Sequence, residues 1–194
     1  MMELILASTS RYRRSLLERL QLPFHCLPPE VDETPHDGEG PEQLALRLAR
    51  AKANAIASRQ PGALVIGSDQ VACLDGVLLG KPGNRDRARA QLAASSGRTV
   101  AFYTGLAIRG IDAQVDASVV EPFSVHFRDL SASEIENYLD REQPYDCAGS
   151  FKCEGLGIAL FSRMEGRDPT ALEGLPLIAT CELLRDAGLN VLSD

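Results

Sequence analysis

Two carboxylates of this chain have the residue type and the position that phosphate chemistry needs. Asp69 comes just after an apolar run, residues 64–67, that predicts a buried strand. Glu33 lies in an irregular acidic segment that follows a pair of prolines. A carboxylate at the end of a strand in an α/β sheet faces a crevice, where it can bind a divalent cation, accept a proton from water, or do both. Asp69 is therefore a candidate general base, and Glu33 is a second candidate carboxylate.

Three lysines supply cations that such a site would use. Lys52 lies on a predicted helix, Lys81 follows a predicted hairpin, and Lys152 lies in a glycine-rich loop. Each stands beside a turn or a motif-like segment and can point inward, although most lysines are solvated, and spacing alone leaves both alternatives open. The set favours metal-assisted phosphate chemistry, and the sequence contains neither a Walker motif nor a Rossmann glycine fingerprint.

A cationic cluster near the N-terminus is a candidate anion site. Residues 3–7 predict a strand and residues 11–20 a helix, and the segment between and after them carries three hydroxyls (residues 8–10) and three arginines, Arg11, Arg13 and Arg14. A helix start offers unpaired backbone N–H groups and a positive dipole end, and guanidinium groups aimed at one place beside it bind phosphate. The alternative is a surface helix capped by Ser10 with solvated arginines. These residues alone leave the two alternatives open.

Composition and charge narrow the class of protein. The 194 residues, 44% of them hydrophobic, predict one folded domain over residues 1–194. The formal charge is −7, with 20 Lys and Arg against 27 Asp and Glu, which argues against a general nucleic-acid or membrane binder. No apolar stretch approaches the roughly 20 residues that span a bilayer, and the N-terminus lacks a signal-peptide pattern, so we expect a cytoplasmic protein. The five cysteines and three histidines show no zinc-ligand spacing, which favours reduced, incidental thiols.

The predicted elements alternate between strands and helices. Beyond the first strand and helix, helices are expected at residues 41–58, 84–94, 131–139 and 176–187. Strands are expected at residues 24–27, 64–67, 71–74, 77–79, 99–108, 114–127 and 158–161. Asp75 and Gly76 form a hairpin signal, and Ser131 with Glu134 forms a capping box. The pattern predicts a mixed α/β fold whose partly antiparallel sheet is flanked by helices.

Eight segments in order resemble one known family. They are LILASTSRYRRSLL, EVDETP, ALRLARAKA, VIGSDQV, LGKP, FYTGLA, AGSFKCEG and GLPLIATCELL. Together they are similar to the ordered signature of the Maf-like family of nucleoside triphosphate pyrophosphatases, and they run from the first strand to the last helix. The local sequences around Gln70 and Glu154 most resemble those of the branch assigned as 7-methyl-GTP pyrophosphatases. The branch that acts on dTTP and UTP carries Thr after the aspartate and Gln where Glu154 stands.

The resemblance implies an activity and a set of roles. Such enzymes cleave a nucleoside triphosphate between the α- and β-phosphorus with a divalent cation, Mg²⁺, Mn²⁺ or Co²⁺, and release pyrophosphate. Asp69 matches the proton acceptor for the attacking water, and Glu33 an acidic position that shares the metal with it. The positions around the triphosphate are matched by Ser8, Ser10, Arg13, Lys52 and Lys81, and those linked to base choice by Tyr12, Gln70 and Glu154. The implied fold has two lobes around a central cleft and is usually paired as a homodimer.

The three base-linked residues favour a guanine-type base. A carboxylate only accepts hydrogen bonds, so Glu154 suits the donors on the pairing edge of guanine, whereas an amide suits thymine or uracil. Methylation at N7 makes the ring cationic, which suits both Glu154 and the aromatic face of Tyr12. The 7-methyl-GTP branch often has tryptophan where this chain has Tyr12, which offers less stacking area. Two alternatives stay open: a pyrophosphatase for dTTP, UTP or another non-canonical nucleotide, and a non-catalytic nucleotide-binding regulator of cell division.

Overall fold

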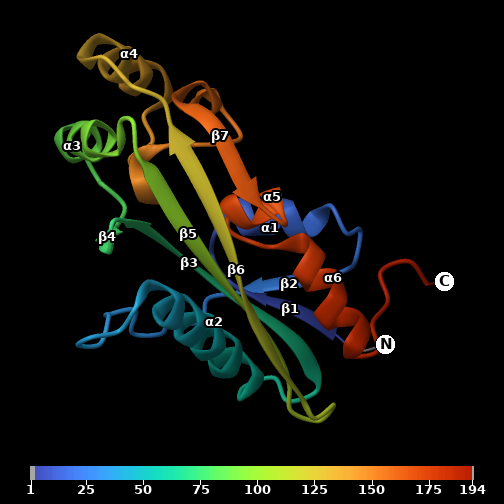
Figure 1. Ribbon diagram of the computed structural model, residues 1–194. Coiled ribbons are helices and arrows are strands. Elements are labelled where there is room, and N and C mark those ends of the chain that lie inside the picture. The colour runs from blue at the N-terminus through green and yellow to red at the C-terminus, as the bar shows by residue number, and fades with distance from the viewer. Residues whose placement is uncertain (1–2, 194) are drawn as a thin grey trace. The chain divides into compact units, whose positions relative to one another are not determined.

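The computed structural model describes residues 3–193 and confirms the mixed α/β class (Figure 1). The seven strands are β1 (Glu3–Ala7), β2 (His25–Leu27), β3 (Ala63–Leu74), β4 (Val77–Leu79), β5 (Thr99–Gly110), β6 (Val115–Phe127) and β7 (Phe161–Gly166). The helices are α1 (Arg11–Glu18), α2 (Pro41–Ala57), α3 (Arg85–Ser95), α4 (Ala132–Glu142), α5 (Pro169–Leu172) and α6 (Leu177–Asp186), with short 3₁₀ segments η1 (Ala148–Ser150) and η2 (Leu156–Leu160). The strand order is β2-β1-β3-β5-β6-β7, and β4 pairs with β3. Pairs β1/β2 and β1/β3 are parallel while β3/β4 and β6/β7 are antiparallel, as a partly antiparallel sheet requires.

The chain divides into two compact units. The first comprises the residues up to Gln70, Thr104–Glu121 and the residues from Asp168 onward, and the second comprises Val71–Tyr103 and Pro122–Arg167. The three long strands β3, β5 and β6 each contribute residues to both units. The single domain over residues 1–194 and the two lobes around a cleft stay predictions. Within residues 3–193, none of the helices combines the length and the apolarity of a membrane span.

The first unit has a separate apolar layer on each face of its strands. On β1, Leu4 and Leu6 pack with side chains of α1 and α6, whereas Ile5 and Ala7 pack with side chains of α2. β3 repeats the pattern, with Leu64 and Ile66 in the first layer and Val65 in the second. Successive residues of a strand point to opposite faces, so an unbroken apolar run predicts a strand covered on both sides. Figure 1 shows α2 on one face of β1 and β3, and α6 on the other.

Two glycines let α2 lie directly against the sheet. A Cβ added at Gly67 on β3 would stand 2.2 Å from the carbonyl oxygen of Ala49, and one at Gly105 on β5 would stand 2.2 Å from that of Ala45. Both contacts are far below van der Waals distance. The alanines on this face of α2 allow the same close approach, which brings the helix and its Lys52 against β3.

The second unit confirms the hairpin and contains an aromatic core. Asp75 and Gly76 have φ of 47° and 84°, and β3 pairs with β4 across them, as expected of a type I′ turn. Phe151 packs edge-on against three other phenylalanines, with ring centroids 4.8–5.7 Å apart: Phe102, Phe127 and Phe161. Helix α4 begins with the predicted capping box, and α3 is joined to it by an ion pair of 2.6 Å between Arg85 Nη2 and Glu136 Oε2.

Several sequence-based boundaries were wrong, among them the end of α4, which lies at Glu142 rather than at residue 139. The strand expected to end at residue 67 continues through Ser68 and Asp69 to Leu74, because each polar side chain in this stretch finds a buried partner. The strand expected at residues 158–161 is the 3₁₀ segment η2, and β7 begins only at Phe161. The residues of β7 are mostly exposed and include the charged Arg163 and Glu165, so the strand has no apolar pattern. Helix α1 ends at Glu18, two residues earlier than expected.

We predict that Gly105→Ala lowers the free energy of unfolding by ~1–3 kcal/mol, because its Cβ overpacks the contact with the α2 backbone. Urea unfolding followed by circular dichroism measures the change. Gly62→Ala is the matched control in the same unit, since its Cβ would make an ordinary 3.8 Å contact with Asp112. Equal stability of the two variants would show that α2 does not lie this close to β5.

Candidate active site

Asp69 lies within a strand rather than beyond its end, yet it extends past the neighbouring strand. β1 pairs with β3 up to Leu6 opposite Ile66 and ends at Ala7, so Asp69 lies beyond the carboxyl end of β1. The Asp69 side chain is 12% exposed. Asp69 was expected to follow the end of its own strand, but β3 continues past it. The strand that ends before Asp69 is the parallel neighbour β1.

Lys52 joins both predicted carboxylates. It lies on α2 and is 5% exposed, and its Nζ is 2.6 Å from Asp69 Oδ1 and 2.6 Å from Glu33 Oε1. A buried ammonium is stable only with partners of opposite charge, and Asp69 supplies a buried one. Glu33 is 60% exposed, so water screens its pair with Lys52. Lys52 therefore points inward, and the solvated alternative is wrong.

Arg13 belongs to the same group of charges. Its Nε donates a hydrogen bond of 2.8 Å to the carbonyl oxygen of Gly174. Burial lowers the pKa of the Arg13 guanidinium, and the negative charges of Asp69 and Glu33 raise it. Arginine remains protonated at neutral pH despite such shifts. Arg13, Glu33, Lys52 and Asp69 together form what we call the Asp69 cluster.

The other two N-terminal arginines point elsewhere. The Arg11 guanidinium lies 4.9 Å from the ring centroid of Tyr12 and donates to its hydroxyl at 3.0 Å. Arg14 is exposed and pairs with Glu18 at 3.0 Å. The expectation that the arginines are aimed at one place is wrong, because each has a different partner close by. Arg13 is turned toward the carbonyl of Gly174.

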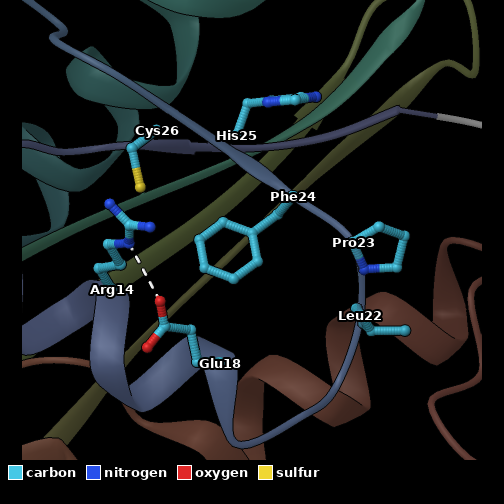
Figure 2. A pocket seen from close by; sticks show the side chains of 7 residues that line it. All are labelled: Arg14, Glu18, Leu22, Pro23, Phe24, His25 and Cys26. Atoms are coloured by element: carbon cyan, nitrogen blue, oxygen red, sulfur yellow. Dashed lines mark hydrogen bonds and ion pairs between the residues drawn. The ribbon is translucent and has the colours of Figure 1, made fainter.

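A hollow beside α1 is separate from the Asp69 cluster. Its volume is about 440 Å³, and it is lined by Arg14, Glu18 and residues 22–26. Figure 2 shows the Phe24 ring and the Cys26 thiol facing it, with Arg14 held by Glu18. Burial raises the pKa of the Cys26 thiol, so it stays protonated at neutral pH. Arg14 of the predicted N-terminal arginine cluster lines this hollow, and no residue of the Asp69 cluster does.

The predicted hydroxyls serve the backbone around α1. Ser10 is the N-cap of the helix, and its Oγ accepts from the backbone N–H of Arg13. Ser8 is buried, and its Oγ accepts from the N–H of Ser10 at 3.1 Å. The capped-helix alternative is therefore confirmed for Ser10. Each hydroxyl also carries a proton that it can donate to a phosphate oxygen.

The amide of Gln70 has a fixed orientation. Its Nε2 donates to the carbonyl oxygens of Ala171 and Leu172 at 2.8 and 3.0 Å and lies 3.2 Å from Thr104 Oγ1. Since carbonyl oxygens only accept hydrogen bonds, the NH₂ group must face them. The Oε1 atom of Gln70 therefore faces away from these carbonyls as an acceptor.

The remaining predicted residues belong to the second unit. Lys81 and Glu154 are both exposed. Lys152 Nζ donates to the backbone carbonyl of Glu142 at 3.1 Å and lies 3.8 Å from its Oε1. These contacts hold Lys152 at the end of α4, and the Glu154 carboxylate accepts a hydrogen bond from the thiol of Cys153 at 3.6 Å.

The carboxylates of Asp69 and Glu33 suit a metal ion whose remaining ligands come from the substrate of the protein. Within residues 3–193, no group of three or more His, Cys, Asp and Glu side chains is arranged to hold a metal ion. Asp69 and Glu33, however, both reach the single Nζ of Lys52, so their oxygens lie close together. One or two carboxylates with substrate phosphates are a usual ligand set for Mg²⁺. The pair therefore fits the predicted divalent cation when phosphate oxygens complete the ligand set.

Sequence reasoning missed the segment that binds Arg13 and Gln70. Gly174 accepts from Arg13 through its backbone, and the α5 carbonyls accept from Gln70. Backbone acceptors leave no side-chain signal in a sequence. Asp168, which holds this segment, had a signal: an Asp directly before a Pro is typical of a capped helix start.

We predict that Lys52→Met lowers the free energy of unfolding by ~3 kcal/mol, because it leaves Asp69 buried without its closest cation. Urea unfolding measures the loss, and the double variant Lys52→Met with Asp69→Asn recovers much of it. Glu33→Gln is the matched control and changes stability by less than ~1 kcal/mol, since Glu33 is exposed. A Lys52→Met variant as stable as the control would contradict the buried pair.

Three solved structures are similar to part of this chain. Each covers 66% of the chain: a HAM1 protein from Coxiella burnetii, at 17% identity and TM-score 0.44 over 73% of its own length; a nucleoside-triphosphatase, or dITP/XTP pyrophosphatase, from Mycobacterium abscessus, at 19% identity and TM-score 0.43 over 76%; and the Ham1 protein of Staphylococcus aureus, at 16% identity and TM-score 0.46 over 72%.

One protein family matches nearly the whole chain. The family model described as "Maf-like protein" matches residues 3–187, from β1 to the residue after α6. The match includes every residue of the Asp69 cluster as well as Lys81 and Glu154. The resemblance of the eight sequence segments to this family is thereby confirmed, while the 7-methyl-GTP branch stays a prediction, and the chain belongs to the Maf-like protein family.

Proposed function

We propose that this chain is a hydrolase that cleaves nucleoside triphosphates between the α- and β-phosphates and releases pyrophosphate. The observation that carries the proposal is the Asp69 cluster, in which a buried carboxylate lies against the buried ammonium of Lys52 and within electrostatic reach of Arg13. Membership of the Maf-like family and the resemblance of the sequence to its pyrophosphatases support the same activity.

Each residue of the cluster has a distinct task in this reaction. Asp69 accepts the proton of the attacking water, and Arg13 and Lys52 stabilise the charge that builds up on the departing pyrophosphate. Lys52 now shares its charge with Asp69 and Glu33. A phosphate oxygen that draws the Lys52 ammonium toward itself leaves the Asp69 oxygen to accept a hydrogen bond from water. Substrate binding and exposure of the base are thus linked through one ammonium.

A divalent cation, Mg²⁺, Mn²⁺ or Co²⁺, is part of the proposal. When bound by Asp69 and Glu33, it would offset phosphate charge and so ease the attack of an anionic nucleophile. The two carboxylates provide the protein ligands, and the exposed position of Glu33 leaves it access to solvent ions. Pairing as a homodimer and a cytoplasmic location stay predictions of the resemblance and the composition.

We propose 7-methyl-GTP as the preferred substrate. The fixed amide of Gln70 presents an acceptor, Oε1, which suits a base edge that carries N–H donors, as guanine does. Glu154 adds an acceptor-only group with a negative charge, which suits the positive charge of the methylated ring. The Tyr12 ring already lies 4.9 Å from the Arg11 guanidinium, and an aromatic face that attracts a cation also suits a cationic base.

We predict that Asp69→Asn lowers the rate of pyrophosphate release ~10²–10⁴-fold, because the amide cannot accept the proton of water. The rate is measured with a panel of triphosphates that includes 7-methyl-GTP, with each divalent cation in turn. Asp116→Asn, which changes a carboxylate that is 67% exposed, is the control and keeps the wild-type rate. Near-normal turnover by Asp69→Asn would remove Asp69 from the mechanism. Absence of turnover by the wild type on every triphosphate would favour a non-catalytic role.

We predict that Glu154→Gln shifts preference away from 7-methyl-GTP and toward UTP, because an amide offers a donor as well as an acceptor to the base. The ratio of kcat/KM for 7-methyl-GTP, GTP and UTP measures the shift. Glu18→Gln, at an exposed position on α1, is the control and leaves the ratio unchanged. A ratio that stays constant in Glu154→Gln would contradict the assignment of Glu154 to base selection.

A further inference from the structure

One backbone carbonyl links Arg13 to the strand that carries Asp69. The oxygen of Gly174 accepts from Arg13 Nε at 2.8 Å and from Ser68 Oγ at 3.0 Å, and Ser68 directly precedes Asp69. Within residues 3–193, the hydrogen bonds found for the Arg13 side chain use only Nε. The bond fixes the rotation of the guanidinium and leaves its two terminal nitrogens for a bidentate contact with phosphate.

The turn that presents this carbonyl has a conformation that glycine tolerates. Gly174 has a φ of 109°, which is unfavourable for any residue with a Cβ. The turn connects α5 to α6, and Gly174 is buried within it. Backbone hydrogen bonds tie the turn to α5, from the Gly174 N–H to the Ala171 oxygen and from the Leu175 N–H to the Thr170 oxygen, so the direction of the carbonyl follows the position of this helix.

Asp168 and Thr170 hold both helices. Asp168 is 2% exposed, and its Oδ1 accepts from the N–H of Thr170 at 2.9 Å and from its hydroxyl at 2.6 Å. Its Oδ2 accepts from the N–H of Ile178 at 2.7 Å, and Thr170 Oγ1 accepts from the N–H of Leu177 at 2.8 Å. Pro176 precedes α6 and provides no side-chain cap. The pair therefore caps α5 and α6 at once and closes the turn between them.

We infer that Asp168 and Thr170 are positioning residues for phosphate binding, which act by fixing the Gly174 carbonyl that orients Arg13. The inference rests on the proposed function, because it assigns Arg13 to the polyphosphate. Asp168 and Thr170 need not touch the substrate. Their effect on affinity passes through Arg13, and this separates them from residues that only stabilise the fold.

A double-mutant cycle with inorganic pyrophosphate as the probe tests the inference, because it requires binding but no turnover. Thr170→Val keeps the shape of the side chain and removes the hydroxyl, with its hydrogen bonds to Asp168 and Leu177, and weakens pyrophosphate affinity about fivefold. In an Arg13→Ala background the same change alters affinity by less than about twofold, because the effect passes through Arg13, whereas independent sites would lose about fivefold in both backgrounds. Titration calorimetry measures each affinity, and circular dichroism checks that each variant is folded.

Matched variants separate an effect on the orientation of Arg13 from a general loss of stability. Thr170→Ser keeps the hydroxyl and restores wild-type affinity. Thr180→Val removes another buried hydroxyl, which donates to the carbonyl of Pro176 at the start of α6, and leaves affinity unchanged. If Thr170→Val fails to fold, Asp168→Asn, which keeps the size and one carbonyl oxygen, repeats the cycle with the same expected coupling to Arg13.

The outcomes distinguish this inference from the proposed function. A wild-type protein that does not bind pyrophosphate overturns both. A wild type that binds, and loses affinity on Arg13→Ala, supports the role of Arg13. If Thr170→Val then weakens binding equally in both backgrounds, or if Thr180→Val weakens it as much, the positioning role is overturned while the proposed function stands.

Discussion

The ion pair between the Lys52 ammonium and the Asp69 carboxylate is the interaction on which the candidate site depends. A carboxylate as buried as Asp69 requires a cation nearby, and Lys52 can supply it only because α2 lies directly against the sheet. That approach depends in turn on Gly67 and Gly105, where any side chain would collide with the helix backbone. The close packing of α2 against the sheet is thus what allows Asp69 to be buried as a charged carboxylate.

A second set of constraints acts on the opposite side of the same strand. Ser68 and Gln70 flank Asp69 and donate to carbonyl oxygens of the α5–α6 segment, as Thr104 does from β5. These bonds satisfy polar groups that would otherwise be costly to bury. The same hydrogen bonds explain how the three polar residues 68–70 can lie within the buried strand β3. Asp69 is therefore held between α2, which supplies its cation, and a segment near the C-terminus, which fixes its neighbours.

The sequence predicted elements well where apolar alternation or a cap marked them, as at β1, α2 and α4. It failed where the stabilising partner lies far along the chain. Residues 68–70 look like the end of a strand because their partners, among them Lys52 and Ala171, are 17 and 101 residues away. Residue type and family resemblance together identified Asp69, Glu33, Lys52 and Arg13. The Gly174 carbonyl could not be found in this way. Every residue has a backbone carbonyl oxygen, and only the folded conformation distinguishes this one.

Charge balance argues that phosphate and cation bind together. Arg13 and Lys52 are offset by Asp69 and Glu33, so the cluster is formally neutral on a chain of charge −7. Such a chain does not attract polyphosphate over long distances, and a local exchange of partners must favour binding. When phosphate oxygens take up the Lys52 ammonium, the two carboxylates lose their shared cation at the same moment. A divalent cation, as proposed here, would then meet two unpaired carboxylates and a polyphosphate, whereas either ligand alone would have to compete with an ion pair that already exists.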